Sequence, residues 1–256
     1  MANTLHSLSR SAANNKSDVL KGTPHDDVLH GSLGHTTFYG GLSDDIYYSK
    51  NAGDTIVEYA NEGNDTVYAD TTFTLPTHVE NLTLEGNGNT FGFGNNSNNI
   101  LIGNSGNNRL SGEEGNDFLY GMGGNDTLSG GNGNDHLNGG DGDDYLAGGL
   151  GSDTIITGAG RDTVAFTAAD IREGSIDRLL DFNPETDKLD LSGMRSLLTG
   201  SNANLSWSKM FVDKDPENVF IVSASAVNYR HEQKNLPKRY QSRAICASPS
   251  PAGKCP

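Results

Sequence analysis

Cysteine is absent from nearly the whole of this 256-residue chain, because its two copies, Cys246 and Cys255, lie close to the C-terminus. No disulfide framework therefore supports the body of the protein, and the redox compartment stays undetermined. Apolar residues make up only 34% and aromatic residues 7%, which excludes a thick core of packed amphipathic helices. Something other than apolar burial must hold the fold together.

Long hydrophobic runs are also missing. No stretch approaches the roughly 18 consecutive apolar residues of a transmembrane helix, so we expect no membrane span. Residues 1–20 lack the continuous apolar segment of a cleavable secretory signal, so export is expected to need another route.

Positive charge is scarce in the body of the chain. Residues 1–227 carry 12 Lys and Arg against 32 Asp and Glu, whereas residues 228–256 carry 6 basic side chains against Glu232 alone. An acidic body repels phosphate backbones and attracts divalent cations, so we expect no nucleic-acid partner.

Catalytic motifs are missing as well. The chain contains no HExxH zinc-protease motif, no GxSxG nucleophile motif, no complete GxGxxG before a helix and no GxxxxGK[ST] phosphate loop. We therefore expect that the chain is not an enzyme.

Glycine, in contrast, is abundant, with 33 copies, and it follows a repeat. From Gly94 to Ala165 the chain divides into eight consecutive nine-residue units without an insertion. Position 4 is glycine in seven of the eight units, and position 8 is always Leu, Ile or Val. The position-6 residues are Asn99, Asn108, Asp117, Asp126, Asp135, Asp144, Asp153 and Asp162.

A shorter array precedes this one, from Gly22 to Tyr48, with Asp27, Thr36 and Asp45 at position 6. Between the arrays, Asp54 and Asp65 each precede an apolar residue by two positions, as in the repeat. We therefore divide the chain into a lead segment at 1–21, degenerate repeats at 22–93, regular repeats at 94–165, a C-terminal β cap and secretion region at 166–227, and a basic tail at 228–256. The sequence leaves open whether 49–93 continues the repeat structure or interrupts it.

Each unit predicts one turn and one strand of three residues. Glycines permit the crowded turn, and the single aliphatic residue at position 8 points inward. Two units then make a flattened coil of 18 residues, about the period of a parallel β-roll. The sequence thus predicts an all-β fold: a parallel β-roll, or β-solenoid, with a C-terminal β cap and a disordered tail.

The roll is expected to need a cation. One buried aliphatic residue per unit returns far less free energy than ordering nine residues costs, and stacked position-6 carboxylates repel each other. Calcium suits these turns because it accepts six or more oxygens in flexible geometry, whereas zinc prefers Cys and His ligands.

The repeat resembles the calcium-binding GGxGxDxUx unit of the repeats-in-toxin (RTX, haemolysin-type) family. In that family each ion lies between the turns of repeats n and n+2. The resemblance implies that Asp117 pairs with Asp135, Asp126 with Asp144, Asp135 with Asp153, Asp144 with Asp162, and Asp27 with Asp45. We expect carbonyls of the turns to add ligands, with Gly115, Gly124, Gly133, Gly142 and Gly151 as the candidate residues.

Departures from the repeat predict weak or empty sites. Asn99 and Asn108 lack charge, and Thr36 is expected to break its edge. Since Asp135 belongs to two predicted sites, Asp135→Ala should impair folding most, whereas Asn99→Ala should matter little.

The segment SIDRLLDFNPETDKLDLSGM after the repeats resembles the region that follows the repeats in secreted serralysin-type metalloproteases. Its matching residues include Asp177, Asp181, Asp187 and Asp190. We expect a β element that covers the last coil, the alternative being a calcium site of its own.

The resemblance also implies a function and a place. Proteins of this family leave bacteria through one-step export machinery that reads an uncleaved C-terminal signal. We therefore expect a calcium-binding protein that is secreted, or held at the cell surface, and that folds on external calcium. The alternative is the non-catalytic C-terminal part of an exported serralysin-type protease or other hydrolase.

Overall fold

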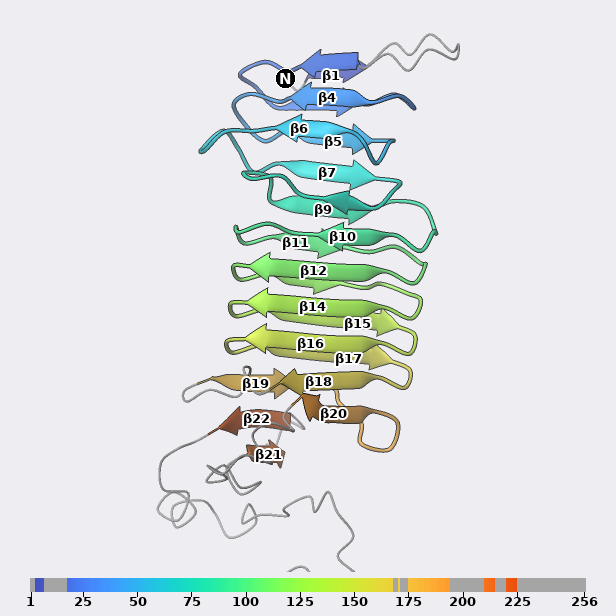
Figure 1. Cartoon of the computed structure of the whole chain (residues 1–256), viewed down its shortest axis with the longest axis vertical. Helices are drawn as coiled ribbons and strands as arrows, with labels where there is room; N and C mark the ends of the chain where they lie inside the picture. The colour runs from blue at the N-terminus through green and yellow to red at the C-terminus, as the bar shows by residue number, and fades with distance from the viewer. Residues whose placement is uncertain are drawn as a thin grey trace, which may run out of the picture.

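The computed structural model describes residues 3–6, 18–167, 170, 175–193, 210–214 and 220–224. The secondary-structure elements assigned in these residues are all β-strands. The strands stack as successive coils along one axis (Figure 1). The predicted all-β parallel roll is therefore confirmed. The predicted tail at 228–256 and the cap residues 194–209 lie outside the described residues.

Three sheets form the walls of the roll. The first has twelve strands in the order β1 (Asn3–His6), β3 (Asp27–His30), β5 (Ile46–Ser49), β7 (Thr66–Ala69), β9 (Asn81–Leu84), β11 (Ile100–Ile102), β13 (Phe118–Tyr120), β15 (His136–Asp141), β17 (Thr154–Ala159), β19 (Ile176–Leu179), β22 (Phe220–Ala224) and β21 (Met210–Lys214). The second has seven: β20 (Lys188–Gly193), β18 (Thr163–Thr167), β16 (Tyr145–Leu150), β14 (Thr127–Asn132), β12 (Arg109–Glu114), β10 (Phe91–Phe93) and β8 (Phe73–Thr74). The third has three: β2 (Asp18–Lys21), β4 (Thr36–Tyr39) and β6 (Thr55–Val57).

The regular repeats form coils of 18 residues, as predicted. Leu119 pairs with Leu137 in parallel register, and the turns repeat at the same interval of 18 residues. The position-8 side chains fill the interior between the two walls. All eight are 0% exposed: Leu101, Leu110, Leu119, Leu128, Leu137, Leu146, Ile155 and Val164.

Strands in the middle of the roll are longer than the three residues that the repeat predicted. β12 and β14 have six residues each, because their pairing continues past position 9 into the following turn, where Glu113 pairs with Gly131 and Glu114 with Asn132. The glycines at the start of each turn therefore serve as strand residues too.

The degenerate segment continues the first wall without a break. β5, β7, β9 and β11 pair in parallel, although the coils vary in length: equivalent turn residues lie 20 residues apart at Asp45 and Asp65, 15 at Asp65 and Glu80, and 19 at Glu80 and Asn99. The opposite wall is interrupted, because β6 ends the third sheet and β8 begins the second. Residues 49–93 thus belong to the roll.

Strands also extend the roll beyond both arrays. β1 and β2 precede Gly22 and pair with β3 and β4. At the other end, β19 and β20 pair in parallel with β17 and β18, and β22 pairs antiparallel with β19. The residues that resemble the serralysin-type segment therefore make the last coil.

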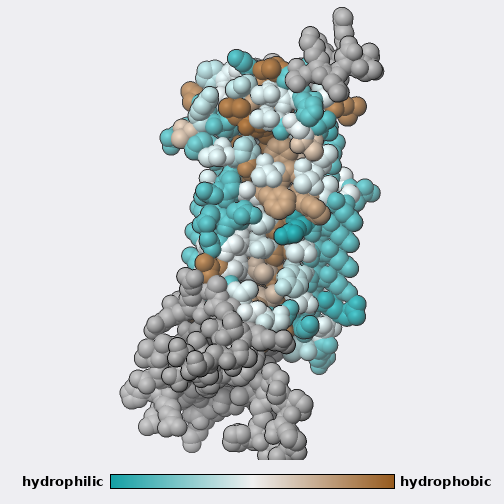
Figure 2. Space-filling model, in the orientation of Figure 1, coloured by the Kyte–Doolittle hydropathy of each residue, from teal (hydrophilic) through white to brown (hydrophobic). Residues whose placement is uncertain are grey.

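Polar turns and apolar interior separate clearly in this geometry. In Figure 2, hydrophilic residues gather along the two sides of the roll, where Figure 1 places the turns, and a paler strip runs between them. Among the described residues, no helix is long and apolar enough to cross a membrane.

Candidate metal sites

Aspartates at position 6 of the repeats close the turns and bond each coil to the next. The backbone N–H of Asp117 donates to Oδ1 of Asp135 (2.8 Å), and the N–H of Asp135 donates to Oδ1 of Asp153 (2.9 Å). We call such a series along one edge a ladder, and each of its residues a rung. Apart from Asp27, which accepts from the Thr23 N–H in its own turn, each aspartate rung thus satisfies a backbone donor of the preceding coil.

Two ladders run along the two edges of the roll. The first, on the turns that lead from even-numbered to odd-numbered strands, comprises Asp27, Asp45, Asp65, Glu80, Asn99, Asp117, Asp135, Asp153 and Asp177. The second, on the opposite edge, comprises Asn108, Asp126, Asp144, Asp162 and Asp187, with Thr36 and Asp54 as a separate pair nearer the N-terminus. The backbone N–H of Thr36 donates to Asp54 Oδ1 (2.7 Å), so this bond between coils is kept although Thr36 offers no carboxylate.

The structure brings together every aspartate pair that the sequence suggested. Consecutive rungs join Asp27 with Asp45, Asp117 with Asp135, Asp126 with Asp144, Asp135 with Asp153, and Asp144 with Asp162. All of these rungs are at most 2% exposed. Their role as calcium ligands is a proposal, taken up below.

One carboxylate oxygen of each aspartate in these pairs is buried and has no hydrogen-bond partner. It is Oδ1 in Asp27 and Oδ2 in Asp45, Asp117, Asp126, Asp135, Asp144, Asp153 and Asp162. A buried carboxylate oxygen without a donor is energetically unfavourable, so a positively charged partner would stabilise each of these atoms.

Position-1 glycines hold open the space in front of these oxygens. A Cβ on Gly130 would lie 2.2 Å from Asp135 Oδ2 and 2.4 Å from the carbonyl oxygen of Gly148 in the next coil. The same arrangement recurs at Gly112, Gly121 and Gly139, each facing an aspartate Oδ2 and a carbonyl of the next coil. Carboxylate and carbonyl oxygens are the ligands that calcium takes, in flexible geometry. The residues present therefore fit calcium.

Position-4 glycines, which the sequence suggested as carbonyl ligands, all adopt left-handed backbone. The φ angles are 110° at Gly115, 99° at Gly124, 142° at Gly133, 136° at Gly142 and 135° at Gly151. Their carbonyls point along the roll, since a Cβ on Gly133 would lie 1.7 Å from the carbonyl oxygen of Gly115. The position-1 glycines were not predicted as part of the sites, although glycine occupies that position in seven of the eight regular units.

Asparagine rungs differ from aspartate rungs in one decisive way. Asn99 accepts from the N–H of Asn95 (2.7 Å), and its Nδ2 donates to the carbonyl of Glu80 (3.1 Å). Asn108 makes the same two kinds of bond, to the N–H of Asn104 and the carbonyl of Thr90. The amide satisfies itself within the protein, whereas the carboxylate does not, so the asparagine rungs need no ion.

Burial shifts the titration of the aspartate rungs. It raises the pKa of Asp117, Asp135 and Asp162 to about 6 and that of Asp126 and Asp153 to about 7, from an ordinary value near 4. The backbone hydrogen bond that each accepts opposes this rise without cancelling it. In the absence of an ion, the folded roll therefore favours protonated rungs.

The sign of this shift predicts a pH dependence. Because the pKa is raised on folding, protons stabilise the ion-free roll fully below about pH 4, and that stability is lost as the pH rises through about 6 to 7. In excess chelator we expect more strand signal in circular dichroism at pH 5.5, above the sequence pI of about 4.7, than at pH 7.5. With calcium present, the midpoint concentration for folding should rise as the pH falls. Equal strand signals at the two pH values in chelator would contradict the assignment.

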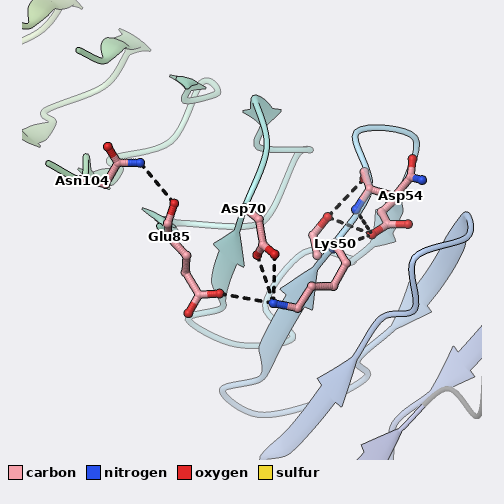
Figure 3. Close-up of polar contacts among 7 residues, drawn as sticks. Lys50, Asp54, Asp70, Glu85 and Asn104 are labelled. Atoms are coloured by element: carbon pink, nitrogen blue, oxygen red, sulfur yellow. Dashed lines mark hydrogen bonds and ion pairs between the residues drawn. The ribbon is translucent and has the colours of Figure 1, made fainter. Parts of the chain in front are cut away.

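On the second edge, a lysine side chain supplies the positive charge for one pair of acidic residues. Lys50 Nζ lies 3.0 Å from Asp70 and 3.6 Å from Glu85 (Figure 3). The Lys50 N–H also donates to Asp54 Oδ2 (3.1 Å), and Asn104 donates to the Glu85 carbonyl (3.1 Å). The acidic groups of this degenerate part of the edge have cationic or N–H partners within the protein.

Several rungs were not predicted from the sequence. Asp54 and Asp65 were noticed as echoes of the repeat, and Asp177 and Asp187 as cap residues, but none was proposed as a rung. Glu80 gave no signal, because it does not stand at a repeat aspartate position. The same holds for Glu58, which is not a rung but lies opposite Gly40 on the same edge. Coil lengths of 20, 15 and 24 residues conceal the alignment of Asp65, Glu80 and Asp177.

Comparison with known families matches the RTX calcium-binding nonapeptide repeat in four copies, at residues 13–37, 21–56, 93–128 and 129–164. Among curated proteins, the chain is similar to the endo-1,3-1,4-beta-glycanase ExsH of Rhizobium meliloti (strain 1021), with 40% identity over 85 residues. The match covers 33% of this chain and 18% of that relative, so the chain spans only a small part of the relative's length.

Proposed function

Because the chain belongs to the RTX calcium-binding nonapeptide repeat proteins, we propose that it is a secreted protein whose roll folds on calcium outside the cell. Binding, rather than catalysis, is then its activity. The observation that carries the proposal is the buried carboxylate oxygen without a partner, repeated from Asp117 to Asp162 and again at Asp27 and Asp45.

Calcium is the proposed partner of these oxygens. The rungs Asp117, Asp126, Asp135, Asp144, Asp153 and Asp162 would hold ions between successive coils, together with turn carbonyls. When bound, the ion supplies the positive charge that the two ladders lack. The chain itself supplies the carboxylate oxygens, and in the folded roll the hydrogen bond to Oδ1 holds each carboxylate in place.

Calcium-dependent folding also suits the export that we propose. Cytosolic calcium is low, so an acidic chain would stay unfolded for passage through one-step export machinery and would fold in the calcium-rich exterior. The dissociation constants of extracellular calcium modules, about 0.1 to 1 mM, match such a switch.

Equilibrium dialysis against calcium, with circular dichroism on the same samples, tests the binding proposal. We expect several ions to bind per chain, with strand signal rising over the same calcium range. A chain that gains strand signal while taking up no calcium would overturn it.

The second candidate is the non-catalytic part of a larger exported hydrolase. The partial similarity to a glycanase favours it, since the 85 matched residues make up only 18% of that relative. Both candidates predict that this chain cleaves neither casein nor mixed-linkage 1,3-1,4-β-glucan. Hydrolysis of either substrate by the purified chain would refute the non-catalytic assignment.

A further inference from the structure

Three buried acids meet at one point on the first edge, outside the regular repeats. Asp45 precedes β5, Glu58 follows β6 and Asp65 precedes β7. One ligand oxygen from each lies within 4.8 Å of the other two. Their exposed fractions are 1%, 7% and 0%. We call Asp45, Glu58 and Asp65 the acidic triad.

Glu58 enters this group because it replaces a position-1 glycine. It lies one coil beyond Gly40, whose N–H donates to Glu58 Oε1 (3.2 Å). A Cβ on Gly40 would meet Asp45 Oδ2 at 2.2 Å and Glu58 Oε1 at 2.4 Å. In the regular coils a backbone carbonyl faces this space, so the substitution puts a third carboxylate where the repeats offer a neutral oxygen.

Each member of the acidic triad has an oxygen without a partner. Oδ2 of Asp45, Oε2 of Glu58 and Oδ2 of Asp65 are all buried and accept no hydrogen bond. The other oxygens hold the triad in place: Asp65 Oδ1 accepts from the Asp45 N–H (2.8 Å), and Glu58 Oε1 accepts from the Tyr47 hydroxyl. Each acid therefore brings one buried, unpartnered oxygen to a cluster in which the three carboxylates lie within 4.8 Å of one another.

Within the described part of the chain, the charged groups that act on the acidic triad are other acids. Asp27, Glu62 and Glu80 each raise the pKa of a triad member, after burial itself, which is the largest cause. On the opposite edge, Lys50 supplies a cation to Asp70 and Glu85. Among the residues that the structure describes, Asp70 and Glu85 are thus paired with a lysine, whereas no member of the acidic triad forms an ion pair.

We propose that Asp45, Glu58 and Asp65 form a calcium site of a different kind from the repeat sites, with three carboxylates around a single ion. The proposal goes beyond the repeats, because Glu58 and Asp65 lie outside the segments that match the nonapeptide. Three carboxylates attract a divalent cation more strongly than two, so this site fills at a lower calcium concentration than the sites of the regular repeats.

The donor set selects the class of ion. Only oxygen ligands are present, which favours hard cations over zinc or copper. Oxygens on opposite sides of calcium lie about 4.6 to 5.2 Å apart, twice its usual bond length, whereas magnesium draws them to about 4.0 to 4.2 Å. Three oxygens within 4.8 Å of one another can therefore all contact a single calcium ion.

Glu58→Gln is the principal test, because it removes one carboxylate and keeps the shape of the side chain. Glu62→Gln is the matched control: Glu62 lies in the same turn, and its Oε2 accepts from the Tyr59 N–H at the exposed surface. Equilibrium dialysis should show one fewer tightly bound calcium per chain in Glu58→Gln and no change in Glu62→Gln. An unchanged ion count and affinity in Glu58→Gln would overturn the proposal.

Terbium luminescence provides a readout that does not depend on the folding of that variant. Tyr47 contacts Glu58 and should sensitise terbium bound at the acidic triad. Tyr47→Phe keeps all three carboxylates, so we expect it to lower the tyrosine-excited emission at the first equivalents of terbium without changing the number of ions bound. Unchanged emission would count against the site.

The outcome is separable from that of the proposed function. Loss of bound calcium in Asp135→Ala with none lost in Glu58→Gln would leave the repeat sites standing and remove only the triad. Loss of bound calcium in Glu58→Gln, with none lost in Asp135→Ala, would support the triad and remove the repeat sites.

Discussion

Replacing Asp135 with alanine should raise the calcium concentration needed for folding well above that of the unmodified chain. The change removes Oδ1, which accepts from the Asp117 N–H, and leaves that buried donor unsatisfied at a cost of about 1–3 kcal/mol. It also removes the unpartnered Oδ2 that we assign to calcium. Calcium titrations followed by circular dichroism would measure the shift in midpoint.

Asp141→Ala is the matched control for this prediction. Asp141 is an exposed carboxylate in the same array, so its loss changes the net charge equally without touching a rung. Equal midpoints for Asp135→Ala and Asp141→Ala would refute the ladder assignment. Asn99→Ala, expected from the sequence to matter little, is no longer a neutral control, because Asn99 is buried and bonds to Asn95 and Glu80.

Replacing Gly133 with alanine should prevent folding at calcium concentrations that fold the unmodified chain. Gly133 has a φ of 142°, where a side chain costs about 1–3 kcal/mol, and the new Cβ would lie 1.7 Å from the carbonyl oxygen of Gly115. The neighbouring coil is fixed by its own hydrogen bonds and cannot withdraw cheaply. The strand signal at a fixed calcium concentration would report the loss.

Gly88→Ala supplies the comparison for Gly133→Ala. The nearest atom to a Cβ at Gly88 is Thr90 Cγ2 at 3.9 Å, which is ordinary contact. We expect this variant to fold like the unmodified chain. If Gly133→Ala also folded normally, the close stacking of position-4 glycines would be wrong.

The regular part of the fold could be predicted from the sequence, because its period is strict. A period of nine residues with one aliphatic residue places Leu119 above Leu137, and the same arithmetic places Asp117 beside Asp135. Register in a solenoid follows from repeat length alone when no residue is inserted.

The degenerate coils could not be aligned in this way. Two extra residues separate Asp65 from Asp45, and three fewer than the usual 18 separate Glu80 from Asp65. Only the strand pairing in the structure shows which turn residues meet. Glu58 could not be predicted for another reason: it keeps the regular 18-residue interval from Gly40 but replaces a position-1 glycine, and its approach to Asp45 depends on the stacking of β6 on β4.

The unpartnered oxygens also lay beyond the sequence. Composition shows that aspartates are many, but not that each uses one oxygen for a backbone N–H and leaves the other without a donor. Nor does it show that Asn99 satisfies both its polar atoms within the chain. This difference between the two residue types is what connects the ladders to calcium.

The most direct test of the account is far-ultraviolet circular dichroism of the whole chain at pH 7.5, first in excess chelator and then in excess calcium. The account predicts little strand signal in chelator and a large, reversible gain on adding calcium, because the buried ladders then acquire their positive charge. A full strand signal in chelator, unchanged by calcium, would contradict it.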